Sequence, residues 1–101
     1  YRFHRTAAAR LVEPAVIVDN EVSSSATVLE VRGPDSIGFL YRVTRAFVEL
    51  DLDIARAKVH TLGDDVIDTF YVLGPDGAKV TDSEYLAEIE IAVLSAIGAD
   101  A

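Results

Sequence analysis

The residues of this chain that could do chemistry are scattered, and they match no known catalytic arrangement. The two histidines, His4 and His60, lie far apart in the sequence, and cysteine is absent. Neither His-x-x-x-His nor Cys-x-x-Cys occurs, so no metal-ligand spacing is present. The serines at 23–25 have no neighbouring base, and the acid pairs at 51/53 and 64/65 lie at expected turns, where Asp caps backbone N–H groups. The sequence therefore predicts no active site, no metal and no cofactor in this segment.

Residues 33–40 are the most informative segment, because they should join a strand to a helix. Asp35 or Ser36 can serve as the helix N-cap after the Gly-Pro turn. Gly38 is expected in the first helical turn, where glycine costs about 1 kcal/mol relative to alanine. Its presence indicates either close approach of a ligand or tight packing of the helix on the sheet. Free N–H groups at a helix start suit a carboxylate or another anion, whereas the absence of lysine and of Gly-x-Gly argues against a phosphate loop.

Hydrophobic periodicity predicts the elements that position this segment. Alternating or β-branched runs indicate strands at residues 14–18, 26–32, 54–62 and 66–73. An i, i+3, i+4 pattern beginning at Ile37 indicates an amphipathic helix, with Arg42 and Arg45 expected on its outer face. The spacing of Thr81 and Glu84 matches a capping box for a second helix, for which Gly98 suits a left-handed stop.

The order of these elements predicts an α+β, ferredoxin-like sandwich with a permuted chain. The last five elements form a split β-α-β unit that lacks its final strand. An open sheet edge there would favour aggregation, so we expect the strand at 14–18 to fill it. The result would be a ββαββα chain with a four-stranded antiparallel sheet and two helices on one face. Residues 1–13 are then expected to be linker from a longer protein, and 14–101 the domain.

Composition and charge narrow the classes of function further. The chain has 101 residues, half of them hydrophobic, with 9 basic and 17 acidic side chains and a net charge of −8. This length fits one domain with one core. No apolar run approaches the roughly 20 residues of a membrane span, and no secretory signal is present, so we expect a cytoplasmic protein without a membrane partner. An acidic body repels phosphate backbones, which argues against nucleic-acid binding.

Three segments of the chain, residues 27–41, 50–54 and 68–72, resemble the ACT domain family. The family usually has Asp-Arg-Pro-Gly at the first strand–helix loop. Here Asp35 and Gly38 match that pattern, whereas serine and isoleucine replace the arginine and the proline. The resemblance implies an ACT-type sandwich that binds a free amino acid at this loop and regulates a larger protein.

The resemblance also implies particular site residues and partners. The ligand carboxylate would meet N–H groups at the helix start, and its ammonium would meet Asp35 or Asp53, the latter being where the family has a ligand-contacting Asn. A closer similarity, to ACT domains of nitrogen-control nucleotidyltransferase/phosphodiesterases, implies glutamine as the ligand, neighbouring domains of the parent enzyme as partners, and a homodimer through the ACT sheets. The implied ligand-binding residues are Asp35, Ser36, Ile37, Gly38, Phe39, Leu40, Asp53 and Ile54.

Other classes of function stay open from the residues alone. The altered loop also fits a ligand-free oligomerisation module whose sheets pair edge to edge. An RNA-binding sheet would need exposed aromatic and basic residues, of which Tyr71 and the basic row at 56, 58 and 60 are a faint version that the net charge opposes. A small phosphatase would need an Arg–Asn pair, but Asn20 is the sole asparagine. The basic row itself is typical of a solvated sheet face, the alternative being contact with an acidic strip on a partner sheet.

Overall fold

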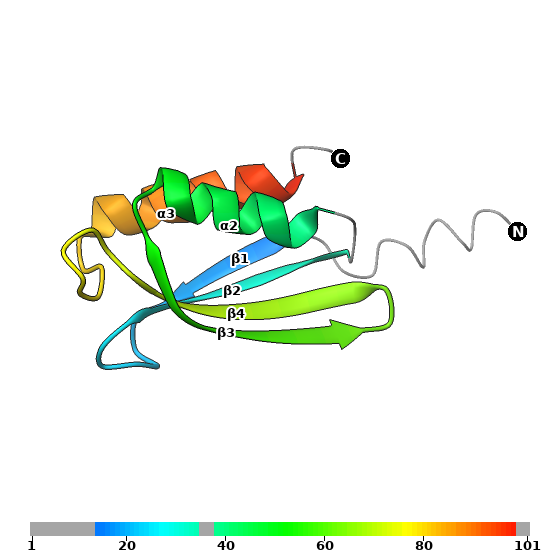
Figure 1. Cartoon of the computed structure of the whole chain (residues 1–101), viewed down its shortest axis with the longest axis horizontal. Coiled ribbons are helices and arrows are strands. Elements are labelled where there is room, and N and C mark those ends of the chain that lie inside the picture. The colour runs from blue at the N-terminus through cyan, green and yellow to red at the C-terminus, as the bar shows by residue number, and fades with distance from the viewer. Residues whose placement is uncertain (1–13, 35–37, 99–101) are drawn as a thin grey trace, which may run out of the picture.

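Strands and helices follow one another as ββαββα, the order expected from the hydrophobic periodicity. The computed structural model describes residues 14–34 and 38–98. Both helices cover the same face of the sheet (Figure 1), so the prediction of an α+β sandwich is confirmed. The elements are β1 Ala15–Asp19, β2 Thr27–Pro34, α2 Phe39–Glu49, β3 Asp53–Leu62, β4 Asp65–Leu73 and α3 Ser83–Gly98.

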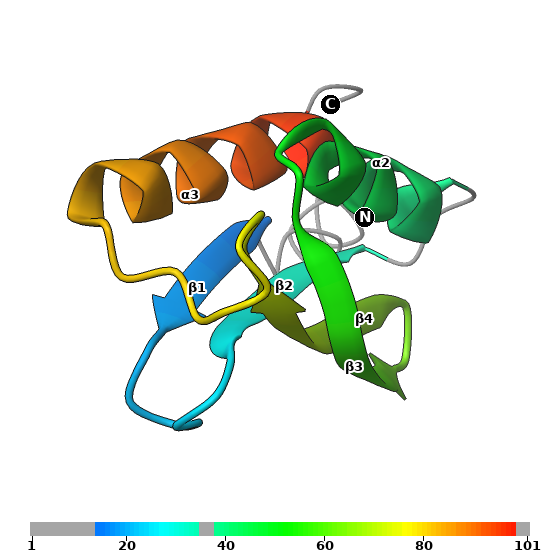
Figure 2. The same cartoon turned by 60° about the vertical axis from the view of Figure 1, so that its left-hand side comes forward.

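The four strands form an antiparallel sheet in the order β1-β2-β4-β3. β1 pairs with β2 from Ala15 opposite Arg32 to Asp19 opposite Val28. The first strand of the chain thus occupies the sheet edge that the split β-α-β unit leaves vacant, and the predicted permutation is confirmed. Figure 2 shows β1 and β3 at the two opposite edges of the sheet.

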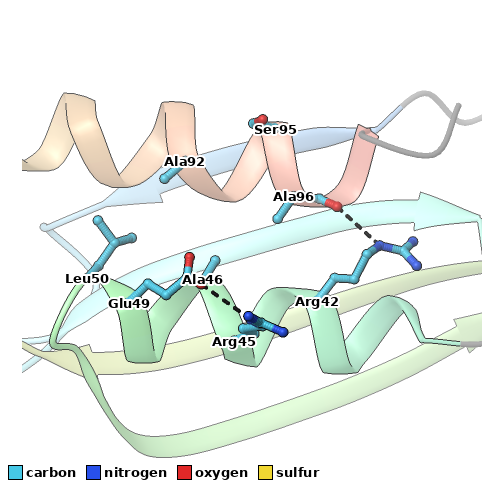
Figure 3. Close-up of a pocket in the computed structure, with 8 residues that line it drawn as sticks. All are labelled: Arg42, Arg45, Ala46, Glu49, Leu50, Ala92, Ser95 and Ala96. Carbon is cyan, nitrogen blue, oxygen red and sulfur yellow. Dashed lines mark hydrogen bonds and ion pairs between the residues drawn. The ribbon is translucent and has the colours of Figure 1, made fainter.

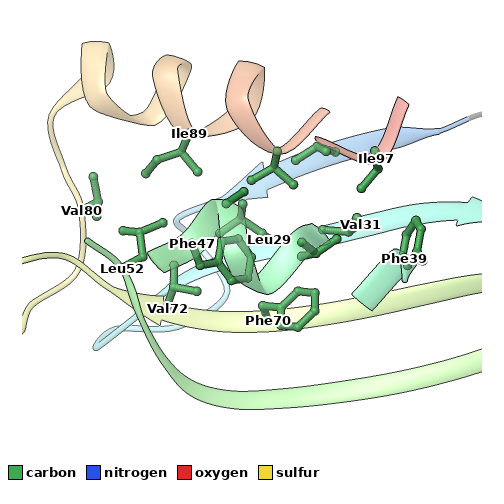
Figure 4. Packing of buried hydrophobic residues seen from close by; sticks show 14 of the residues in the cluster. Leu29, Val31, Phe39, Phe47, Leu52, Phe70, Val72, Val80, Ile89 and Ile97 are labelled. Carbon is green, nitrogen blue, oxygen red and sulfur yellow. The ribbon is translucent and has the colours of Figure 1, made fainter. Parts of the chain in front are cut away.

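Side-chain alternation determines which face of the sheet packs on the helices. In β4 every second residue is buried, and Phe70 and Val72 are 1% and 0% exposed. In β2, Leu29 and Val31 are fully buried on the same face. Phe47 of α2 meets Phe70 edge to face, with ring centroids 5.1 Å apart, in the centre of this core (Figure 4). Such aromatic pairs add to the burial term that drives folding.

The α3 helix also packs on this core and buries Ile89, Val93 and Ile97. The start of α3 differs from the predicted capping box, because Glu84 N–H donates to the Asp82 carboxylate at 3.3 Å. Asp82 therefore caps the helix one residue after the expected Thr81. Gly98 does not adopt the left-handed conformation expected of it, and α3 includes it as its last residue. Neither α2 nor α3 has the length and apolarity needed to span a membrane.

Candidate functional site

The start of α2 is shaped by the backbone conformation of Gly38. This residue is the N-cap of the helix and has φ 86° and ψ −3°, in the left-handed region that favours glycine. The expected placement of Gly38 inside the first helical turn is wrong by one position. Among the described residues, a Cβ at this site would meet Arg42 Nη1, at 3.4 Å. The left-handed φ angle thus accounts for the presence of glycine at position 38.

In the described part of the chain, no side chain caps the N–H groups of the first turn of α2. The Gly38 carbonyl accepts the Arg42 N–H at 2.9 Å, which closes the first helical turn. Gly38 has no side chain with which to cap the helix, and the first turn contains no acidic residue. The first N–H groups of a helix have no intrahelical acceptor and attract negative charge. An anion at this end of α2 remains a prediction of the sequence that this geometry allows.

The two hydrophobic residues predicted for the site have different environments. Phe39 is 3% exposed and belongs to the core, whereas Leu40 is 47% exposed. A Cβ at Gly33 would lie 2.7 Å from Phe39 Cε1, so a glycine at the end of β2 lets this ring pack against the strand. The Phe39 side chain is thus a structural anchor, and only its N–H group can face a ligand. The sequence pattern around Gly33 does not by itself indicate this role.

Arg42 is the polar residue that sequence reasoning missed at this site. It was expected on the outer face of the helix, but it is half-buried between α2 and α3. Its Nε donates to the Ala96 carbonyl at 3.1 Å (Figure 3), so its charge lies at the C-terminal end of α3. Position i+4 from Gly38 lies on the same helix face, and this spacing could have identified Arg42.

A groove of about 350 Å³ runs between α2 and α3 beside Arg42. Figure 3 shows side chains of both helices along it. Arg45 donates to Glu49 at 3.3 Å and to the Tyr41 hydroxyl at 3.3 Å, and both contacts raise the pKa of this guanidinium. The groove is near the lower limit of volume for small-molecule sites. It is lined by Arg42, Arg45, Ala46 and Glu49 of α2, by Leu50, and by Ala92, Ser95 and Ala96 of α3.

The structure separates Asp53 and Ile54 from the loop with which they were grouped. Both residues lie at the start of β3, which follows the C-terminal end of α2. The helix has 11 residues and is therefore about 16 Å long, so Gly38 and Asp53 lie near opposite ends of it. Asp53 instead lines a separate hollow with Asp51. Asp35, Ser36 and Ile37 lie outside the described residues.

Asp68 is a buried carboxylate that the sequence analysis did not consider. It is 2% exposed on the helix-facing side of β4 and pairs in register with Val31 of β2. The alternation that identifies Phe70 and Val72 as core residues also assigns Asp68 to the buried face. A buried carboxylate is costly unless it is paired or hydrogen-bonded. In the described part of the chain, no group of three or more His, Cys, Asp or Glu side chains could hold a metal ion.

Comparison with known proteins agrees with this geometry. The sequence model of a family described as "ACR9-like, ACT-like domain" matches residues 15–97, which includes all six elements up to the last turn of α3. The chain belongs to the ACT-like domain family. The resemblance noted in the residues around the β2–α2 loop is confirmed.

Two curated relatives of this ACT-like domain have the same description. They are the bifunctional uridylyltransferase/uridylyl-removing enzymes of Rhodospirillum rubrum and Azospirillum brasilense, each 45% identical over 86 residues. The match covers 85% of this chain but 9% of each enzyme, so the chain spans a small part of their length. A crystal structure of an unknown protein from Galdieria sulphuraria shares the fold, with a TM-score of 0.57 and 22% identity over 70% of this chain and 37% of that one.

Proposed function

We propose that this ACT-like domain binds free glutamine and regulates a larger enzyme of the uridylyltransferase/uridylyl-removing type in nitrogen control. The identity of 45% to two such enzymes supports the choice of parent. The uncapped start of α2 behind the left-handed Gly38 is the observation that carries the choice of site. In this proposal the domain contributes no catalytic group, and the chemistry belongs to neighbouring domains of the parent.

The proposed binding mode uses the two positive features at the start of α2. The ligand α-carboxylate accepts N–H groups of the first turn, where the helix dipole is positive. The Arg42 guanidinium lies next to Gly38 and adds charge on the same side. The ligand ammonium requires a carboxylate close to the loop. Because Asp53 lies at the far end of α2, Asp35 is the acid that we assign to it.

Regulation requires that glutamine bind one arrangement of the parent's domains better than another. Such coupling typically amounts to about 1–3 kcal/mol, or 5- to 150-fold in affinity. The hydrogen bond from Arg42 in α2 to the Ala96 carbonyl near the end of α3 supports a route for this coupling. A ligand that draws Arg42 away from Ala96 would change the packing of the two helices. We propose that neighbouring domains and a second copy, paired through the sheets, respond to this change.

Isothermal calorimetry with glutamine tests the site through substitutions of Gly38. The Gly38→Asp variant places a carboxylate where the ligand carboxylate should bind, and we expect at least a tenfold loss of affinity. Gly38→Asn is the matched control, because Asn has the same size, tolerates positive φ and carries no charge. Gly77→Asp adds the same charge at another left-handed glycine, φ 79°, with no atom near its Cβ position, and should leave affinity unchanged.

The possible results distinguish a wrong placement of the ligand from a wrong function. Undiminished glutamine affinity in Gly38→Asp would refute the placement of the ligand at this loop. A folded wild-type chain that binds no amino acid would refute the sensor and leave a ligand-free oligomerisation module, the function that the altered loop also fits. Binding of another amino acid in preference to glutamine would refute the nitrogen-control role but keep the site.

A further inference from the structure

Exposed hydrophobic side chains gather on the two helices. Nine large hydrophobic side chains are exposed in the described part of the chain, and five of them belong to α2 or α3. Tyr41 and Val48 of α2 and Ile91 of α3 are the most exposed of the five, at 63%, 71% and 69%. Each is adjacent in sequence to a residue that lines the groove between the helices, so the three form its apolar rim. Apolar side chains concentrated in this way are typical of a surface that another element covers.

The groove has the shape of a helix-binding site. Arg42 of α2 donates to the Ala96 carbonyl near the end of α3, and Tyr85 near the start of α3 donates to the Leu50 carbonyl, so the two helices run antiparallel. The groove extends from Arg42 and Ala96 at one end to Leu50 at the other, and both helices line it (Figure 3). No described segment lies over the outer side of either helix (Figure 1). The side-chain ridge of a third helix packs into such a groove.

Charge is divided along the groove. Arg42 and Arg45 come first along α2 and form its basic end. Glu49 in the last turn of α2 and Glu88, exposed on α3 about one turn after Tyr85, form its acidic end. Arg45 and Glu49 pair with each other at 3.3 Å, but their side chains are 62% and 66% exposed, and such surface pairs contribute little free energy. Both charges can therefore exchange this contact for one with a partner.

We propose that this groove is a docking site for an amphipathic helix from another domain of the parent enzyme. The docked helix packs an apolar stripe against the apolar rim, places an acidic side chain at the basic end, and places a basic side chain at the acidic end. Arg42 and Glu49 are seven residues apart, or about 10 Å along α2, which sets the spacing of the two charges on the partner. The match spans 9% of each related enzyme, so a parent of that kind has most of its chain outside this domain. The choice of occupant rests on the proposed parent, whereas the groove and its charges are independent of glutamine.

Fluorescence anisotropy with synthetic helices, measured without glutamine, tests this proposal. Each probe is a stapled helix of about four turns with one leucine stripe, and the probes differ only in the charges at their two ends. The bipolar probe has glutamates at one end and lysines at the other, and the two control probes have lysines at both ends or glutamates at both ends. We expect the bipolar probe to bind at least tenfold more tightly than either control. Simple attraction to a chain of net charge −8 would instead favour the probe with lysines at both ends.

Substitutions in α3 and α2 locate the binding site of the probe. Ala92→Met fills the groove and should weaken the bipolar probe at least tenfold, whereas Ala87→Met adds the same side chain to α3 outside the groove lining and should leave its affinity unchanged. Arg45→Glu should shift the preference to the probe with lysines at both ends, and this gain of binding can be seen only in a folded domain.

Three results would each overturn the docking site. They are equal or weaker binding of the bipolar probe relative to a control probe, undiminished binding by Ala92→Met, and self-association of the chain that excludes the probe from the groove. A chain that binds the bipolar probe but no glutamine would keep the docking site and refute only the proposed sensor.

Discussion

The two ends of α2 are built in opposite ways. At the C-terminal end, Asp51 has φ 57° and its N–H donates to the Val48 carbonyl, while Leu52 N–H donates to Phe47. These two bonds form a Schellman motif, in which the backbone itself satisfies the last carbonyls. Tyr85 of α3 closes this end by donating its hydroxyl to the Leu50 carbonyl.

Among the described residues, which resume at Gly38, the N-terminal end has no comparable closure. Gly38 supplies no side-chain cap, and among the described residues the Arg42 guanidinium would lie 3.4 Å from a Cβ at this position. The backbone thus satisfies the last carbonyls at one end of the helix, whereas at the other end we propose that the first N–H groups bind an anion. Low local stability is common at ligand-binding segments, because these must reorganise when the ligand binds.

Removal of β1 should have the largest effect, because both ends of α2 rest on the sheet that β1 completes. Without residues 1–21 the edge of β2 is exposed, and we expect loss of cooperative thermal unfolding and aggregation, measured by circular dichroism and size-exclusion chromatography. Removal of residues 1–13 alone is the control and should leave the melting transition unchanged. An unaltered transition after the longer deletion would contradict the contribution of β1 to the fold.

Truncation of one hydrophobic side chain near each end of α2 should change the free energy of unfolding by different amounts. Phe47→Ala removes a ring that is 1% exposed and should lower the free energy of unfolding by about 3–5 kcal/mol. Leu40→Ala, at the opposite end and 47% exposed, should cost less than about 1 kcal/mol. Urea unfolding of both variants measures the difference. Comparable losses would show that the start of α2 is as tightly packed as its end.

A smaller effect is expected from Tyr85→Phe, which removes the hydroxyl that closes the C-terminal end. Loss of this hydrogen bond should cost about 1 kcal/mol below pH 9. Burial, with the charges of Asp51 and Glu88, raises the pKa of Tyr85. The folded state therefore retains the proton above the ordinary tyrosine pKa of about 10. The stabilisation is present below that pH and is lost as the pH rises through the raised pKa.

Unfolding measured from pH 8 to 11 tests this linkage. The wild type should lose stability faster than Tyr85→Phe over the upper part of that range. The two stabilities should then converge. If the free energies of unfolding of the two proteins change with pH in parallel, the Tyr85 hydroxyl does not stabilise the fold through its hydrogen bond to the Leu50 carbonyl.

The fold could be predicted because it depends on repeated patterns. Alternation around Leu29 and Phe70 identified the buried face, and the cost of an open edge placed the strand at 14–18. Errors arose where a single residue decides the geometry. The cap of α3 is Asp82 rather than Thr81, because either residue can supply the capping oxygen and periodicity alone does not choose between them.

The candidate site was predicted less completely, because it depends on tertiary packing. The proposal of an anion at the helix start followed from chemistry, but the inward turn of Arg42 depends on the Ala96 carbonyl of α3. The family resemblance grouped Asp53 with the β2–α2 loop. Within one chain, however, the length of α2 separates Asp53 from that loop. The burial of Asp68 could have been predicted from the alternation in β4, because Asp68 lies on the same face as Phe70 and Val72.

The most direct test of an open, ligand-binding start of α2 is a titration of the isotope-labelled chain with glutamine, followed by amide and arginine Nε–H NMR. We expect the largest shifts at Gly38, Phe39 and Leu40 and at the Arg42 Nε–H, with little change at Leu50–Asp53. Shifts concentrated at the C-terminal end of α2, or none at saturating glutamine, would contradict the division of the helix into a closed structural end and an open binding end.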